Sequence, residues 1–397
     1  MLTLLLASML MLAFHVQSVK AEGTIYIMAD GSIEPTTAPI QRNGDIFTLT
    51  NNINSDNDGI VIERDNIVVD GAGYMLNGSG NGIGINLTVR NHVTLRNMSV
   101  GFFSSGIMLY DSTNNTIEAC EVTENYMGID LVYFSHHNNL YDNSLTNNTF
   151  GIALYWSDYN SIFGNTMKLN EYGIRFQTAE FDDVFCNNFI DNEEHVQFFS
   201  ASEPIYWFYL EGNYWSNYTG ADLNHDGIGD DQYTMMGRDI ANDYPYWDND
   251  MAPLMGLFSR FSDSLGHFVN VISNSTITGF EFIESNSTIR MQVSNSTPTQ
   301  DFGFCRIGIP HSIMDVSNIS AIVDDGETQV LYPNFTLRDS GISIDNETYR
   351  WIYFAYRHST HEVIIAPEFP TFLILPLFMI ATLLAVIAYK RKHCRTD

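Results

Sequence analysis

The chain has 397 residues, of which 47 are Asp or Glu and 18 are Lys or Arg, and its formal net charge is −29. A surface this acidic repels the phosphates of nucleic acids, so we exclude nucleic acid as a partner. The hydrophobic content of 45% is sufficient for a buried core, and the length allows two or three folded units.

The first 21 residues are predicted to be a secretory signal peptide. Leu2 to Phe14 is an apolar run, and Val19-Lys20-Ala21 supplies a cleavage site with small residues. No Lys or Arg precedes the run, which departs from the usual pattern. Secretion would permit glycosylation at twelve Asn-x-Ser/Thr sequons, at Asn77, Asn86, Asn97, Asn114, Asn147, Asn217, Asn274, Asn286, Asn295, Asn318, Asn334 and Asn346.

A repeat with a period of 22 or 23 residues occupies residues 84–189. Apolar residues within it alternate with other residues, a period of two that is typical of strands and not of helices. A coil of about 22 residues with three short strands is one rung of a right-handed parallel β-helix, and rungs stack about 4.8 Å apart. Each repeat begins with a Gly-Ile pair, at Gly84-Ile85, Gly106-Ile107, Gly128-Ile129, Gly151-Ile152 and Gly173-Ile174.

Asparagines recur inside the repeat at one position, in Asn143, Asn165 and Asn187. Their 22-residue spacing predicts an interior ladder in which each side-chain amide bonds to the next rung. The alternative is that these residues only form turns.

The repeat is predicted to lie within a capped β-helix over residues 22–250. Ile25-Tyr26-Ile27 begins an N-terminal cap that covers the open strand edges. The period breaks after Phe189, and the aromatic and acidic residues 198–250 are expected to close the other end.

An acidic loop within this closing segment is a candidate Ca²⁺ site. Oxygen ligands at its first, third and fifth positions and a glycine at the sixth match the first half of an EF-hand loop. Tyr233 stands where an EF-hand has Glu, so we expect a shorter loop, and a simple polar turn is the alternative. The candidate ligands are Asp222, Asn224, Asp226, Ile228, Asp230 and Asp231.

The C-terminal third changes character. Alternating strands separated by short turns predict a small β-sandwich over residues 257–366. Residues 371–389 are apolar and uncharged, and basic residues follow at once in the tail 390–397. This pattern predicts one transmembrane helix that anchors the protein at the cell surface, with the tail in the cytoplasm.

The outward positions of the rungs carry the candidate ligand-binding residues. Asp130 and Arg175 fall in one outward column, two rungs apart, and Tyr110, Tyr155 and Trp156 fall beside it. Aromatic rings with polar tips suit carbohydrates, so we assign these five residues to a carbohydrate-binding face. Asp130 and Arg175 are also weak candidates for catalysis, with solvated surface as the alternative.

The Gly-Ile rungs, Asp65-Asn-Ile-Val-Val-Asp-Gly-Ala-Gly and Gly212-Asn-Tyr-Trp-Ser-Asn-Tyr resemble the NosD-type β-helix family of the pectate-lyase-like superfamily. The resemblance implies a periplasmic copper-binding accessory protein linked to maturation of a nitrous oxide reductase. Pro367-Glu368-Phe369-Pro370, with the span that follows, resembles an archaeal surface-protein sorting signal and implies a sorting transpeptidase as a partner.

Three functions are therefore considered. The first is non-catalytic binding of envelope polysaccharide, surface-layer components or metal ions. The second is a polysaccharide lyase, epimerase or glycosidase acting on acidic glycans. The third is copper binding, for which His136, His137, Met108 and Met127 are available, although no Met-x-x-Met or Cys-x-x-Cys cluster exists.

Overall fold

The computed structural model describes residues 23–199, 205–207, 211–239, 244–263, 265–296, 301–314, 319–324, 329–332, 338–340, 348–357 and 359–367. The chain divides into two compact units, Met1–Arg260 and Phe261–Asp397. The described elements are strands apart from one short 3-10 helix, η1 (Glu284–Asn286), so the predicted all-β class is confirmed.

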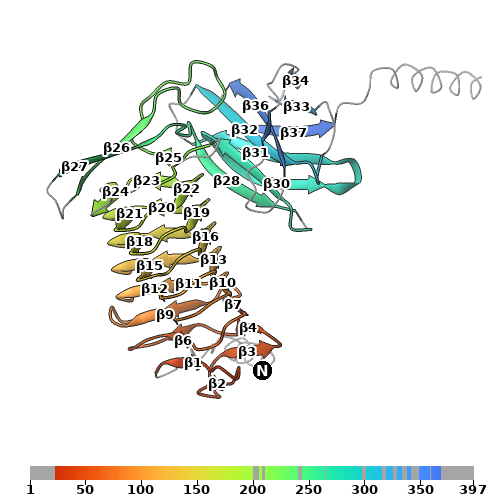
Figure 1. Ribbon diagram of the computed structural model, residues 1–397. Helices are drawn as coiled ribbons and strands as arrows, with labels where there is room; N and C mark the ends of the chain where they lie inside the picture. Colours follow the sequence, from red (N-terminus) through yellow and green to blue (C-terminus); the bar gives the residue numbers. More distant parts are fainter. Residues whose placement is uncertain are drawn as a thin grey trace, which may run out of the picture. The chain divides into compact units, whose positions relative to one another are not determined.

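The first unit is the predicted right-handed parallel β-helix, with rungs of about 22 residues stacked along one axis (Figure 1). Each rung contributes one strand to each of three sheets. Sheet A runs in the order β2 (Ile33–Glu34), β1 (Ile25–Ile27), β6 (Ile60–Ile62), β9 (Ile83–Thr88), β12 (Ser105–Tyr110), β15 (Met127–Val132), β18 (Phe150–Tyr155), β21 (Tyr172–Gln177) and β24 (Glu194–Phe199).

Sheets B and C follow sheet A along each rung. Sheet B runs in the order β22 (Asp183–Phe185), β19 (Ser161–Phe163), β16 (Asn139–Tyr141), β13 (Thr116–Glu118), β10 (Val93–Arg96), β7 (Ile67–Asp70), β4 (Ile46–Leu49) and β3 (Ile40–Asn43). Sheet C runs in the order β25 (Tyr214–Trp215), β23 (Asn188–Ile190), β20 (Thr166–Lys168), β17 (Ser144–Thr146), β14 (Glu121–Thr123), β11 (Ser99–Gly101), β8 (Met75–Asn77) and β5 (Ile53–Asn54).

The Gly-Ile pair has a separate physical role for each residue. A Cβ on Gly128 would lie 2.4 Å from the carbonyl oxygen of Gly151, and one on Gly151 would lie 2.5 Å from that of Gly173. No side chain fits there, because consecutive rungs approach too closely. The adjacent Ile129 is fully buried, as are its counterparts in the other repeats. The glycine therefore permits the close spacing of the rungs, and the isoleucine contributes to the core.

The predicted asparagine ladder is confirmed inside the turn between sheets B and C. The side-chain amide of Asn143 donates to Oδ1 of Asn165 at 2.9 Å, and Asn165 donates to Asn187 at 3.0 Å. Each Oδ1 also accepts the backbone N–H of the residue one rung earlier, as Asn165 does from Asn143 at 3.0 Å. Buried amides are thus fully paired along the axis.

Two further ladders were not predicted, although they have the same spacing. One lies in the turn between sheets C and A, and the other lies in the turn between sheets A and B, where an aspartate ends it. The first consists of Asn125, Asn148, Asn170 and Asn192, and the second of Asn115, Asn138, Asn160 and Asp182.

The sequence period breaks after Phe189, as predicted, yet the structure has a further rung beyond it. β24 pairs in parallel register with β21, placing Val196 beside Ile174. The sequence period is hidden because His195-Val196 replaces Gly-Ile in this rung. Beyond it, Trp215 stacks on Phe189 with 4.3 Å between ring centroids and so continues the apolar column of sheet C.

A two-stranded antiparallel ribbon of β26 (Tyr233–Asp239) and β27 (Tyr244–Asp250) follows in the closing segment. Its last residue, Asp250, is fully buried and accepts hydrogen bonds from the Trp215 indole at 2.9 Å and the Asn213 backbone at 2.6 Å. Because Asn213 is the next member of the Asn143 ladder, Asp250 terminates that ladder.

The second unit contains two five-stranded sheets that contribute to one hydrophobic core. The alternating strands predicted in the C-terminal third are observed there. One sheet has the order β28 (Leu257–Ser262), β29 (Phe268–Ser273), β32 (Phe302–Pro310), β36 (Tyr349–Arg357) and β35 (Arg338–Ser340). The other has the order β30 (Ser275–Ile283), β31 (Thr288–Asn295), β37 (His361–Pro367), β33 (Ile319–Asp324) and β34 (Gln329–Tyr332).

The predicted signal peptide (1–21), transmembrane segment (371–389) and tail (390–397) lie outside the described residues, as does all of the sorting motif except Pro367. Within the described ranges, no helix has the length and apolar character needed to span a bilayer.

Candidate functional site

The outward column predicted on sheet A is confirmed by the strand register. Asp130 on β15 lies beside Met108 on β12 and Ala153 on β18, and Ala153 lies beside Arg175 on β21. Two steps of strand spacing place Asp130 and Arg175 about 10 Å apart. Ala153 between them has the smallest side chain of this stretch, and it is buried.

A row of aromatic side chains follows the ends of the sheet A strands on one side of this column. Tyr110 and Trp156 are 41% and 43% exposed. Tyr133 contacts Tyr110, Tyr155 and Trp156, with ring centroids 5.6, 4.8 and 5.3 Å away. Its hydrogen bond with Tyr155 raises the pKa of Tyr133. The predicted residues Tyr110, Tyr155 and Trp156 therefore form one cluster, which Tyr133 completes.

Tyr133 was missed from the sequence because it is not part of the alternating strand pattern. It follows β15 in a left-handed turn, with φ of 41°, and Trp156 occupies the equivalent turn of the next rung with φ of 48°. Aromatic residues rarely adopt this conformation. The signal that could have found Tyr133 is its place one residue after the end of its sheet A strand, as Trp156 follows the end of β18.

A second aromatic row lies at the start of the sheet A strands and was also missed. Phe150 stacks on Tyr172 with 4.9 Å between centroids, and Tyr126 contacts Phe150 edge-on at 5.6 Å. Phe150 and Tyr172 pair in register, one residue before each Gly-Ile pair. The column of Asp130, Ala153 and Arg175 therefore runs between two aromatic rows.

Asp130 has an unusual environment for a carboxylate. No hydrogen bond or ion pair to its side chain is present among the described residues, although burial excludes much of the surrounding water. That burial raises the pKa of Asp130 to about 7, and the positive charge of Arg175 offsets the effect only in part. At neutral pH this carboxyl group can therefore exist in both protonation states.

Arg175 is held in place by uncharged neighbours. Its guanidinium lies 5.0 Å from the ring centroid of Phe150 and 5.4 Å from that of Phe199. One N–H group donates to the side-chain oxygen of Gln177 at 2.8 Å. The stacking fixes the guanidinium plane and leaves most of its five N–H donors without a protein acceptor in the described structure.

The predicted Ca²⁺ loop folds around its own backbone. The carboxylate of Asp222 accepts the N–H groups of Asp226 and Gly227 at 3.0 and 2.9 Å. Asp226 accepts the N–H of Ile228 at 2.9 Å. Within the described ranges, no group of three or more His, Cys, Asp or Glu side chains is arranged to hold a metal ion. Calcium binding by this loop, including Asn224, Asp230 and Asp231, stays a prediction.

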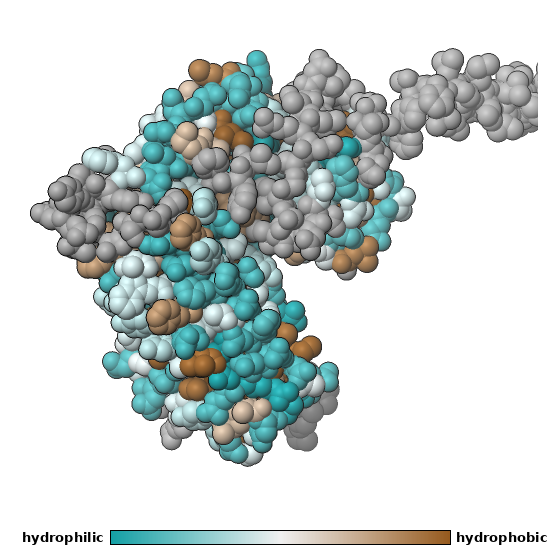
Figure 2. All heavy atoms as spheres, in the orientation of Figure 1, coloured by the Kyte–Doolittle hydropathy of each residue, from teal (hydrophilic) through white to brown (hydrophobic). Residues whose placement is uncertain are grey.

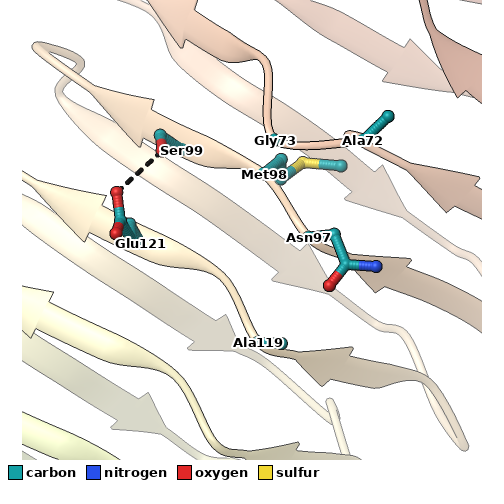
Figure 3. A pocket seen from close by; sticks show the side chains of 7 residues that line it. All are labelled: Ala72, Gly73, Asn97, Met98, Ser99, Ala119 and Glu121. Atoms are coloured by element: carbon teal, nitrogen blue, oxygen red, sulfur yellow. Dashed lines mark hydrogen bonds between the residues drawn. The ribbon is translucent and has the colours of Figure 1, made fainter. Parts of the chain in front are cut away.

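A separate cavity of about 470 Å³ lies at the turn between sheets B and C (Figure 3). The hydroxyl of Ser99 and the carboxylate of Glu121 in its lining are already paired, because Ser99 donates to Glu121 at 2.9 Å. The cavity contains none of the predicted site residues and offers few polar groups to a ligand. It is lined by Ala72, Gly73, Asn97, Met98, Ser99, Ala119 and Glu121.

The rungs, with the two aromatic rows on sheet A, define a parallel β-helix protein with a polar and aromatic outer face. The face of the molecule in Figure 2 is mostly hydrophilic, with scattered hydrophobic side chains. The sequence profile of a family described as periplasmic copper-binding protein (NosD) matches residues 21–220, just over half of the chain. The chain belongs to this NosD family.

None of the curated proteins compared with the chain matches it. Solved structures give a more distant likeness. The Dettilon tailspike protein gp208 is 12% identical over 79% of this chain and 68% of its own, with a TM-score of 0.27. ORF18 of Geobacillus virus E2 is 9% identical over 83% and 68%, with a TM-score of 0.29. The enzymatically active domain of bacteriophage CBA120 tailspike protein 2 is 9% identical over 86% and 67%, with a TM-score of 0.32. A likeness at this level carries no argument about function.

The described residues do not fit the copper site that the family description implies. Copper sites use thiolate, thioether or imidazole ligands. Cys120 is buried, and burial raises its pKa to about 12, so it stays a protonated thiol. Nδ1 of His136 accepts the backbone N–H of Asp158 at 2.9 Å, and the His137 ring stacks on Tyr159. No group of three or more His, Cys, Asp or Glu side chains gathers into a ligand set in the described structure.

Proposed function

We propose that this protein is an extracytoplasmic polysaccharide-binding protein that holds its ligand along the outer face of sheet A. The observation that carries the proposal is the column of Asp130, Ala153 and Arg175 lying between two aromatic rows. Aromatic rings with polar tips stack on the apolar faces of sugar rings, while charged groups bond to hydroxyls. Ala153 contributes only a methyl group to the column between the two charged residues.

The regular rung spacing supports a polymeric ligand. The aromatic residues come from consecutive rungs about 4.8 Å apart, so sites for neighbouring sugars are repeated along the axis. Multiple weak contacts along one chain give useful avidity without a deep pocket. The outer face of sheet A provides that series, whereas the cavity at Glu121 is a single depression.

A binding experiment on the full chain tests this proposal. We expect the wild type to bind oligosaccharides on a glycan array, and Trp156→Ala to weaken binding about tenfold because one stacking surface is lost. Phe102→Ala is the matched control, since Phe102 is also an exposed aromatic residue in a left-handed turn but lies between β11 and β12. Equal losses in both variants, or no binding by the wild type, would contradict the proposal.

A second candidate function is glycan cleavage by a lyase, epimerase or glycosidase. It is favoured by one observation, the unpartnered carboxyl of Asp130 with its pKa of about 7. A group that titrates near neutrality can take or give a proton during catalysis. The enzyme reading predicts turnover of acidic polysaccharides that is abolished in Asp130→Asn. Binding without turnover at any pH between 5 and 9 would exclude it.

We further propose that the protein is held at the cell surface. The periplasmic description of its family supports a location outside the cytoplasm, and the apolar residues 371–389 supply the anchor. Deletion of residues 371–397 is expected to release the protein from the membrane fraction into the medium. Retention of the truncated protein in the membrane fraction would contradict the anchor.

A further inference from the structure

Arg175 differs from three other arginines of the β-helix in having no acidic partner. Arg64, Arg90 and Arg96 each lie within 3.2 Å of an aspartate oxygen. Among the described residues, no carboxylate oxygen lies within 4 Å of Arg175. Arg42 also lacks a carboxylate partner in the described structure, but its guanidinium donates to the backbone oxygens of Asp30, Gly31 and Gly44.

The neighbours of Arg175 hold its guanidinium in a fixed orientation. The rings of Phe150 and Phe199 lie 5.0 and 5.4 Å from it, and Gln177 accepts one of its hydrogen bonds at 2.8 Å. A planar guanidinium fixed in this way presents paired N–H groups that match the two oxygens of a carboxylate or a sulfate. Aromatic rings restrict its motion without neutralising its charge, as an aspartate would.

We propose that Arg175 is the anion-recognition residue of the sheet A face and that the ligand is a glycan bearing carboxylate or sulfate groups. This inference rests on the proposed function. One anionic group binds Arg175, and the sugar ring beside it stacks against the aromatic rows. Asp130, about 10 Å below by strand spacing, faces a hydroxyl of a neighbouring sugar.

The strong negative charge of the protein does not prevent this recognition. At physiological ionic strength charges are screened beyond about 8 Å, so an anion at Arg175 responds mainly to nearby groups. The described carboxylate nearest along the column is Asp130, two rungs away. Local attraction at Arg175 therefore selects the anionic ligand, while the overall charge slows its approach.

The test is a glycan array printed with matched triples of one oligosaccharide, in neutral, uronate and sulfated forms, and probed with the full chain at 0.15 M salt. The wild type is expected to bind one anionic form at least tenfold more tightly than the neutral form, since charge-assisted hydrogen bonds are the strong ones. Arg175→Gln should lose this preference and bind the anionic and neutral forms about equally. Arg175→Lys keeps the positive charge but loses the paired N–H groups of the guanidinium, so this variant should keep part of the preference for the anionic form.

The outcomes separate the two proposals. Whichever anionic form shows a gain in affinity that depends on Arg175 identifies the recognised group as carboxylate or sulfate. A wild type that binds neutral and anionic forms equally would overturn the role of Arg175 and leave polysaccharide binding intact. A wild type that binds no form at all would overturn the proposed function itself. Unchanged thermal unfolding of Arg175→Gln shows that the loss is not a folding defect.

Discussion

The inward and outward positions of the same rungs obey different rules. Ile129 points inward, is fully buried, and has an apolar counterpart in every neighbouring rung. Asp130, the next residue, points outward between Met108 and Ala153, neither of which is charged. Repetition inside gives stability because identical neighbours pack and bond along the axis. Variation outside places different chemical groups side by side, which is what recognition requires.

The largest expected effect comes from breaking an interior ladder. Asn165→Ala removes the donors to Leu140, Phe163 and Asn187, and leaves the buried amide of Asn143 without its acceptor. Each buried group left unpaired costs about 1–3 kcal/mol, so we expect a loss of about 3 kcal/mol or more in the free energy of unfolding. Denaturant unfolding followed by circular dichroism measures it.

The matched control is Ser144→Ala, because Ser144 lies on the outward side of β17 in a neighbouring rung. A surface change of this kind is expected to stay within about 0.5 kcal/mol. Similar losses in both variants would contradict the distinction between inward and outward positions.

The next largest effect is expected from the glycine column. In Gly128→Ala the new Cβ would lie 2.4 Å from the carbonyl oxygen of Gly151, so the two rungs must separate locally. Overpacking of this kind costs about 1–3 kcal/mol. Gly73→Ala tests backbone freedom alone, because a Cβ at Gly73 would meet no atom within 4 Å although φ is 78°. A smaller loss for Gly128→Ala than for Gly73→Ala would refute the close-approach explanation.

Asp182 is an interior position where an aspartate takes the place of the asparagine that the other rungs have in this ladder. It is fully buried at the end of the Asn115 ladder, and its Oδ2 has no hydrogen-bond partner in the described structure. Burial raises the pKa of Asp182 well above its usual value. The wild type should therefore lose stability as the pH rises above about 4, where the unfolded chain ionises, until the folded-state pKa is passed.

The substitution Asp182→Asn restores an amide at this position and removes the titration. We expect the variant to be more stable than the wild type at pH 8, with the difference shrinking towards pH 4. Thermal unfolding across this pH range measures it. A constant difference at all pH values would contradict a buried, neutral Asp182.

A further pH-dependent effect is expected at the outward Asp130. Burial raises its pKa to about 7, so the carboxyl destabilises the folded protein increasingly between about pH 4 and pH 7. The unfolding temperature of the wild type relative to Asp130→Asn should therefore fall over this range. A pH-independent difference would show that Asp130 is fully solvated.

The sequence was sufficient for the rungs, the inward columns and one ladder, because a fixed period determines the register of every strand. The same period also placed Asp130, Ala153 and Arg175 in one column. It could not show that Phe199 stacks on Arg175, since His195-Val196 hides the rung to which Phe199 belongs. Nor could it place Tyr133, whose left-handed turn lies outside the alternation. Contacts made by turns and by irregular rungs depend on the folded structure.

A crystal structure of the full chain with a bound oligosaccharide would show directly whether the outer face of sheet A holds the glycan. We expect sugar rings stacked on Tyr155 and Trp156, with an anionic group at Arg175. An oligosaccharide bound instead in the cavity beside Glu121, or along sheet C, would contradict it.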